Sequence, residues 1–197
     1  MIVVTGMHRS GTSLTAALLN RLGAPFGDPA GMIAADRWNQ SGYFEDSQAV
    51  GINLRLLLGL NVDVDHWIDP PATPLARLAT AFTSGKWRYL MPASEATIRA
   101  RADTLASEIA DFGTRTEGVF VKDPRFSLTY RYWRERVRIE GAVFCFRHPE
   151  AVRRSITRRD LMPKAVSTRL WLQHNRGFID SLTGDEPVLL VDYDRFF

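Results

Sequence analysis

The chain has 197 residues, of which 45% are hydrophobic and 24% charged, with a formal net charge of +3. This composition is typical of a globular domain and excludes a disordered or fibrous protein. No apolar stretch approaches the roughly 20 residues that cross a bilayer, and no signal peptide is evident. A lone cysteine, Cys145, excludes an internal disulfide and fits a reducing compartment. We therefore expect a single cytoplasmic domain over residues 1–197, without membrane contact.

Four short apolar segments predict strands, and they are apolar on both faces, as in a parallel sheet covered by helices. They are Ile2–Thr5, Val119–Val121, Ala142–Phe146 and Val188–Val191. Helical patterns separate them at about 12–22, 46–58, 94–113, 126–138, 149–159 and 164–182. The alternation predicts an α/β fold with three layers, in which helices flank a mostly parallel central sheet.

Two of these helices carry more specific expectations. The first is predicted to bury one apolar face, formed by Leu14, Ala17, Leu18 and Leu22. The third is predicted to start at Ser94, a suitable N-cap, and to run as one helix until Gly113 ends it.

A glycine-rich loop follows the first strand directly. Residues 6–13 read Gly-Met-His-Arg-Ser-Gly-Thr-Ser, with the glycine spacing of the phosphate-binding loop G-x-x-x-x-G-K-[ST]. Thr12 stands where that motif has lysine, and the basic residue is Arg9, inside the loop. Inward N–H groups and the start of the following helix favour an anion here. The loop thus predicts a phosphate site, while the missing lysine argues against an ordinary ATP or GTP hydrolase.

A second basic motif follows the third predicted strand. Arg147 stands at the tip of this strand, and Pro149 fits the first turn of the next helix. Ser155 lies seven residues beyond His148, two helical turns on, and returns to the same helix face. Arg147 and Ser155 are therefore predicted to converge on one anion, which a guanidinium fork and a hydroxyl both suit.

Together these motifs resemble those of the sulfotransferases that use 3′-phosphoadenosine 5′-phosphosulfate (PAPS). Residues 9–13, Arg-Ser-Gly-Thr-Ser, resemble the 5′-phosphosulfate loop of this family, Lys-x-Gly-Thr-[Thr/Ser]. Arg147, Pro149 and Ser155 match the spacing of its 3′-phosphate motif, Arg-x-Pro-x-x-x-x-x-Ser. The stretches Gly-Tyr-Phe-Glu-Asp (42–46) and Lys-Asp-Pro-Arg (122–125) also resemble bacterial members. The resemblance implies the P-loop NTPase-like sulfotransferase fold. Members usually continue with a Gly-rich segment that covers the adenine, so the chain is expected to be either trimmed before that segment or a short member of the family.

The resemblance also implies a reaction. A sulfuryl group would pass from PAPS to a hydroxyl or amine of a small molecule or glycan, leaving adenosine 3′,5′-bisphosphate, with no metal. The implied donor-binding residues are Arg9, Ser10, Gly11, Thr12, Ser13, Arg147 and Ser155. The irregular segments 24–45 and 61–93 are expected to form the acceptor pocket.

Three residues are assigned catalytic roles by the same resemblance. Arg9 replaces the lysine of the family and would stabilise the leaving group by its charge, although it cannot act as an acid. Lys122 would contact the transferring sulfuryl group, or it is a strand-end lysine with a structural role. Glu45 would be the base, with its pKa raised by burial, and Asp123 and His8 are alternatives.

Other interpretations stay open. A kinase would need the missing loop lysine and an acid that organises Mg²⁺, and a nucleotide-binding module without catalysis is a further alternative. Ten of the 25 basic residues fall between Arg125 and Arg159. That density suits a solvated helix surface, a basic mouth for a charged nucleotide, or nucleic acid. No interleaved aromatic stacking pattern supports a nucleic-acid partner, so none is expected.

Overall fold

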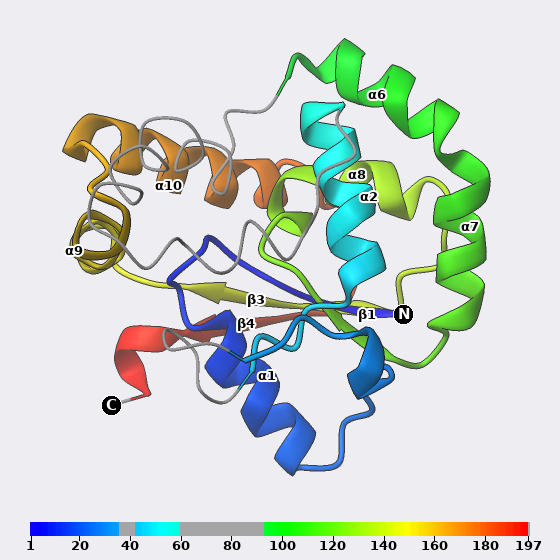
Figure 1. The fold of residues 1–197 in the computed structure, drawn as a ribbon, viewed down its shortest axis with the longest axis horizontal. Helices are drawn as coiled ribbons and strands as arrows, with labels where there is room; N and C mark the ends of the chain where they lie inside the picture. Colours follow the sequence, from blue (N-terminus) through cyan, green and yellow to red (C-terminus); the bar gives the residue numbers. More distant parts are fainter. Residues whose placement is uncertain (36–41, 60–92, 197) are drawn as a thin grey trace.

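A four-stranded parallel sheet organises the protein (Figure 1). The computed structural model describes residues 1–35, 42–59 and 93–196. The sheet has the order β2-β1-β3-β4, with β1 (Ile2–Thr5), β2 (Phe120–Lys122), β3 (Gly141–Phe146) and β4 (Val188–Asp192). Every neighbouring pair is parallel. The α/β class and the parallel sheet predicted from the sequence are confirmed.

Helices cover both faces of this sheet. In the described part of the chain they are α1 (Thr12–Arg21), α2 (Ser47–Leu58), α6 (Glu95–Thr104), α7 (Ala106–Arg115), α8 (Phe126–Arg134), α9 (Pro149–Asp160) and α10 (Lys164–Ile179). There are also two short 3₁₀ turns, η1 (Pro29–Gly31) between α1 and α2, and η2 (Tyr193–Arg195) after β4. Figure 1 shows α1 on one side of the sheet and α2, α8 and α10 on the other. None of the described helices is long and apolar enough to cross a membrane.

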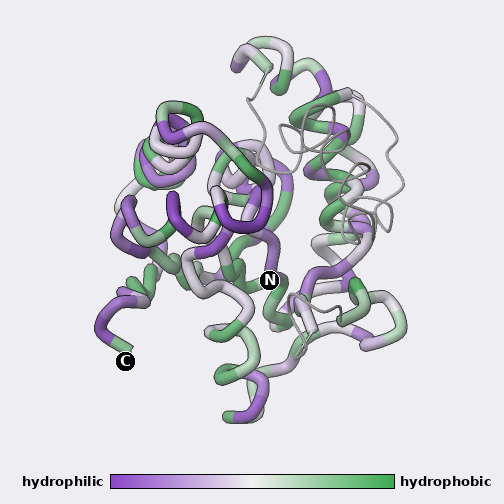
Figure 2. The backbone as a smooth tube through the Cα atoms, turned by 60° about the vertical axis from the view of Figure 1, so that its left-hand side comes forward, coloured by the Kyte–Doolittle hydropathy of each residue, from purple (hydrophilic) through white to green (hydrophobic). Residues whose placement is uncertain are grey.

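The largest part of the core lies between the sheet and α2, α8 and α10. Phe144 of β3 stacks on Phe178 of α10, with ring centroids 4.4 Å apart. Trp133 of α8 is fully buried and meets Phe126 and Phe112 edge-on, at 5.1 and 5.6 Å. Figure 2 shows hydrophobic and hydrophilic residues alternating along the helices, as expected where one helix face is buried.

The buried face of α1 differs from the prediction. Leu18 and Leu22 are 37% and 84% exposed, whereas Thr15 and Ala16 are buried against the strands. Small side chains let α1 approach the sheet closely, and the Cys145 Sγ of β3 lies 3.3 Å from the Thr15 Oγ1. The periodicity of apolar residues predicted the wrong face, because it depends on hydrophobicity alone and not on the space between helix and sheet.

The helix predicted over residues 94–113 is two helices. Ser94 caps α6 as predicted, and its Oγ accepts a hydrogen bond from the Thr97 N–H at 3.3 Å. The break falls at Leu105, with φ −95° and ψ 8°. Gly113 does not end α7 but lies inside it, where an added Cβ would stand 2.4 Å from the Val137 Cγ1. The glycine therefore serves close packing rather than helix termination.

The edge strand β4 is covered less than the sequence predicts. Leu189 and Leu190 point to opposite faces of the sheet and are 56% and 64% exposed. Within the described residues β4 pairs only with β3. Residues 61–92, most of the second segment expected to form the acceptor pocket, lie outside the described residues.

Candidate anion-binding site

The carboxyl ends of the four strands share one edge, because the sheet is parallel. The chain leaves β1 into the loop of residues 6–11, and β2 ends at Lys122. Arg147 directly follows β3, and Tyr193 directly follows β4. In open α/β sheets ligands bind outside this edge, where neighbouring connections run in opposite directions. Here that place lies between the ends of β1 and β3, because the chain continues from β1 to β2 on one side and from β3 to β4 on the other.

The loop after β1 has an unusual backbone. Gly6 has a φ of 142°, and a Cβ at this position would lie 2.1 Å from the Cys145 backbone O. Gly11 has a φ of 89°, and a Cβ there would lie 2.0 Å from the Tyr193 Cδ2. Arg9 adopts φ 70°, a left-handed conformation that costs a non-glycine residue on the order of 1 kcal/mol. The first N–H groups of α1, which have no intrahelical acceptors, lie at this loop. The loop is thus held in the shape that an anion site needs.

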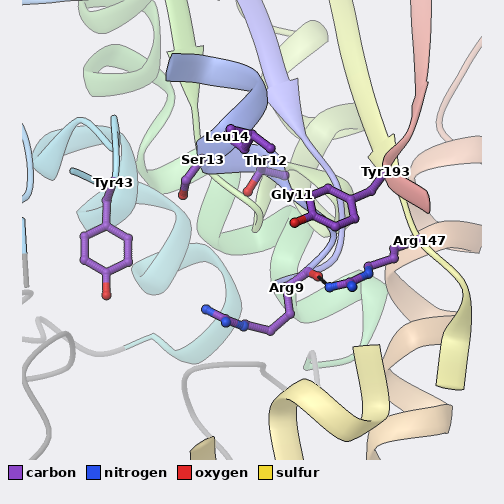
Figure 3. A pocket seen from close by; sticks show the side chains of 8 residues that line it. All are labelled: Arg9, Gly11, Thr12, Ser13, Leu14, Tyr43, Arg147 and Tyr193. Carbon is purple, nitrogen blue, oxygen red and sulfur yellow. Dashed lines mark hydrogen bonds between the residues drawn. The ribbon is translucent and has the colours of Figure 1, made fainter. Parts of the chain in front are cut away.

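Arg9 connects the two sequence motifs. Its Nε donates a hydrogen bond to the Ser155 Oγ at 2.8 Å. The Arg147 Nη1 donates to the Arg9 backbone O at 3.5 Å, the bond drawn in Figure 3. The Arg147 guanidinium also lies 4.3 Å from the centre of the Tyr193 ring and donates to the Asp194 Oδ1 at 3.2 Å. The structure therefore brings Arg147 and Ser155 together, as the spacing predicts, and adds Arg9 between them.

Two hollows open around these residues. The first, about 220 Å³, lies over the loop, and its lining includes Arg9, Thr12, Ser13, Tyr43, Arg147 and Tyr193. In Figure 3 Tyr43 stands at one end of it, and Tyr193 and Arg147 stand at the other. The second, about 480 Å³, lies along α9, and its lining includes Arg9, Arg147, Arg154, Ser155, Arg158 and Arg159. Because Arg9 and Arg147 line both hollows, one ligand with two anionic groups can reach both.

Lys122 and Glu45 form a buried ion pair beside the loop. The Lys122 Nζ lies 2.5 Å from the Glu45 Oε1, and the side chains are 1% and 6% exposed. The same Nζ donates a hydrogen bond to the Ser13 Oγ at 3.2 Å. The two residues assigned to the sulfuryl group and to the base thus lie in contact with each other, and Lys122 also contacts Ser13, just after the phosphate loop.

This pair belongs to a larger buried network that the sequence did not reveal. The Arg125 Nη1 lies 2.8 Å from the Asp123 Oδ1 and 3.6 Å from the Glu45 Oε2. The Asp123 Oδ2 accepts a hydrogen bond from the Asn53 Nδ2 at 2.8 Å, and the Asn53 Oδ1 accepts one from the Trp133 Nε1 at 2.8 Å. The network therefore ties β2 to α2 and α8. Its only sequence signal is the alternation of charges over residues 122–125.

The network shifts the pKa values of its two carboxyl groups in opposite directions. Burial raises the pKa of Glu45, but the charges and hydrogen bonds of Lys122 and Arg125 outweigh it and bring the pKa below the ordinary 4.5. Burial also raises the pKa of Asp123, and repulsion by Glu45 adds to the rise, so this pKa stays above 3.8 despite Arg125. The expectation of a raised pKa for Glu45 is wrong, because two cations share its buried site.

Two further residues at the same edge were missed. Tyr193 lines the first hollow, and the Asp194 Oδ2 accepts a hydrogen bond from the His148 N–H at 2.7 Å. That bond and Arg147 keep the pKa of Asp194 below its ordinary value. The sequence carried the signal, since both residues directly follow β4, as Arg147 directly follows β3.

No model of a protein family, no curated protein and no solved structure matches the chain. The fold and the site define an α/β protein with a basic crevice at the carboxyl edge of its sheet.

Proposed function

We propose that the protein is a sulfotransferase that moves a sulfuryl group from PAPS to a hydroxyl or amine of a small molecule or glycan. The observation that carries this proposal is the meeting of the two motifs, with the Arg9 Nε 2.8 Å from the Ser155 Oγ and Arg147 lining both hollows. A phosphate loop alone suits many nucleotides. A second basic hollow beside it suits a nucleotide with phosphates at two positions. The proposed fold is accordingly the P-loop NTPase-like fold of that family.

The residues present fit such a donor. The hydroxyls of Thr12 and Ser13 and the first N–H groups of α1 are donors for a 5′-phosphosulfate. The Ser10 Oγ is buried, and it has no hydrogen-bond partner among the described residues. A buried hydroxyl without a partner is unfavourable unless a ligand accepts its hydrogen bond. Arg147 and Ser155 would take the 3′-phosphate in the second hollow.

In the proposed reaction the acceptor oxygen or nitrogen forms a bond to sulfur. The bond from sulfur to the bridging oxygen of the 5′-phosphate breaks, and its electron pair stays on that oxygen in the departing adenosine 3′,5′-bisphosphate. Arg9 would stabilise the charge that grows there, as a fixed cation without a proton to give. Lys122, placed at Ser13, would stabilise the oxygens of the sulfuryl group.

A base must take the acceptor proton, and His8 stays an alternative beside the two carboxylates of the buried network. Glu45 is the assigned base, but its ion pair with Lys122 lowers its pKa and makes it a weak base. It would gain basicity if the Lys122 ammonium turned toward the sulfuryl group, because one of the two stabilising cations would then be withdrawn. Asp123, whose pKa is raised, is the alternative. Turnover of Glu45→Gln and Asp123→Asn variants would separate the two.

Calorimetric titration tests the proposal directly. The ligands are adenosine 3′,5′-bisphosphate, ATP–Mg²⁺ and GTP–Mg²⁺. We expect the bisphosphate to bind most tightly and without magnesium. Preference for a triphosphate with magnesium would refute the proposal and indicate a kinase. Tight bisphosphate binding without transfer to any hydroxylated acceptor would indicate a nucleotide-binding module.

A further inference from the structure

Most cations of the second hollow have an acidic partner within the described part of the chain. The pairs are Arg147 with Asp194 at 3.2 Å, Arg154 with Glu150 at 3.2 Å, and Arg159 with Asp160 at 4.0 Å. The pairs of Arg147 and Arg159 bring little net charge to the hollow, whereas Arg154 shares Glu150 with Arg153. Arg147, the residue assigned to the 3′-phosphate, is therefore largely neutralised by Asp194 before any ligand arrives.

Arg9 and Arg158 are the exceptions. Arg9 bonds to the Ser155 hydroxyl and to no carboxylate of residues 1–35, 42–59 and 93–196. Arg158 makes neither a hydrogen bond nor an ion pair with these residues, and its side chain lines the second hollow. A guanidinium that faces a hollow without an acid beside it favours an anion there. Within the described part of the chain, Arg9 and Arg158 are thus the lining arginines of this hollow that have no acidic partner.

Arg158 is also placed next to the assigned 3′-phosphate residues. Ser155 and Arg158 stand three residues apart on α9 and are neighbours on its surface. The Arg9 side chain reaches from the phosphate loop to this face of α9, because it bonds to Ser155 and Arg9 lines both hollows. A phosphate in the second hollow would therefore lie among side chains that include both Arg158 and Arg9.

We infer that Arg158 is a specificity-determining residue, which holds the 3′-phosphate of the nucleotide with Arg147 and Ser155. This inference rests on the proposed function. A guanidinium without a carboxylate partner can form charge-assisted hydrogen bonds to a phosphate dianion without first giving up an existing ion pair. Arg158 would thereby set the preference for nucleotides that carry a 3′-phosphate over those with a 5′-phosphate alone.

The test compares two nucleotides in four proteins. Calorimetry measures the Kd of adenosine 3′,5′-bisphosphate and of adenosine 5′-phosphate for wild type, Arg158→Gln, Arg158→Lys and Arg153→Gln. Arg153→Gln is the matched control, because it removes the same charge from the same helix but Arg153 is paired with Glu150 and does not line the hollow. Arg158 stands in the last turn of α9, where a cation also favours the helix. A loss of helix stability would weaken both nucleotides alike, so the ratio of the two affinities is the readout.

We expect Arg158→Gln to weaken bisphosphate binding about tenfold and adenosine 5′-phosphate binding less than about twofold. The bisphosphate affinity of Arg158→Lys should lie between those of wild type and Arg158→Gln, because lysine keeps the charge but lacks the planar guanidinium. Arg153→Gln should bind both nucleotides as wild type does. If wild type prefers the bisphosphate and Arg158→Gln shows the same preference, the inference is overturned while the proposed function stands. Equal losses for both nucleotides would also overturn it. A wild type without such a preference would overturn the proposed function, and the inference with it.

Discussion

Replacing Glu45 by glutamine tests the buried ion pair beside the phosphate loop. The change keeps the size of the side chain and removes its charge. It leaves Lys122 and Arg125, whose side chains are 1% and 4% exposed, without that carboxylate. Removing one partner of a buried pair costs about 3–5 kcal/mol. Asp123 stays 2.8 Å from Arg125, and the glutamine carbonyl still accepts a bond from Lys122, so we expect about 3 kcal/mol.

Urea-induced unfolding, followed by circular dichroism at pH 7, measures this loss. In thermal unfolding it corresponds to roughly 6–12 °C for a domain of this size. Glu108→Gln is the matched control. The Arg55–Glu108 pair has the same separation of 2.5 Å, but its side chains are 26% and 33% exposed. Exposed pairs contribute about 0–1 kcal/mol, so the control should lose less than 1 kcal/mol.

The pH dependence of this loss of stability follows from the direction in which the fold shifts the pKa of Glu45. The pKa of Glu45 in the folded protein is below its ordinary value of 4.5. The ionised group therefore stabilises the fold fully above about pH 4.5, and this stabilisation is lost as the pH falls below that value. The difference between wild type and Glu45→Gln should be complete at pH 7 and should shrink on acidification. A loss below 1 kcal/mol at pH 7, or a difference that does not shrink in acid, would refute the reasoning.

Three other predictions use the same protein. Arg147→Ala should weaken adenosine 3′,5′-bisphosphate binding about tenfold or more and adenosine 5′-phosphate binding far less; equal losses in calorimetry would remove the 3′-phosphate assignment. Gly11→Ala should destabilise the protein in urea unfolding by about 1–3 kcal/mol, since its methyl group would stand 2.0 Å from the Tyr193 ring. Gly23→Ala is its control, with a similar φ of +91° and nothing within 4 Å, and should lose only about 1 kcal/mol; equal losses would contradict a role for the Tyr193 contact. Burial raises the pKa of the Cys145 thiol to about 11, so a thiol reagent at pH 8 should label it only after unfolding, and rapid labelling of the native protein would contradict this burial.

The secondary structure followed closely from local patterns. The predicted strand Ile2–Thr5 coincides with β1, and the others begin and end within one residue of the observed strands. A buried parallel strand is a short apolar run between turn residues, which is visible without any tertiary contact. The predicted buried face of α1 was wrong, because the small side chains of Thr15 and Ala16 are buried whereas the more hydrophobic Leu18 and Leu22 are exposed.

The sequence by itself determined which residues are candidates for binding an anion. Local properties of the sequence singled out residues 9–13, Arg147 and Ser155. These properties are the spacing of glycines, the basic residue within a loop, and the seven-residue separation that returns Ser155 to the helix face of His148. Only the tertiary structure decided how these residues meet. The bond between Arg9 and Ser155 spans 146 residues, and that between Lys122 and Glu45 spans 77.

Such contacts depend on the order of the strands, which no local pattern encodes. The order β2-β1-β3-β4 places the end of β1 between Lys122 and Arg147. The charge state of Glu45 has the same origin. Its burial was foreseeable from Tyr43 and Phe44, but the pKa of a buried carboxyl depends on which cations the fold sets beside it. Lys122 and Arg125 are brought there from a distant strand, and they reversed the expected shift.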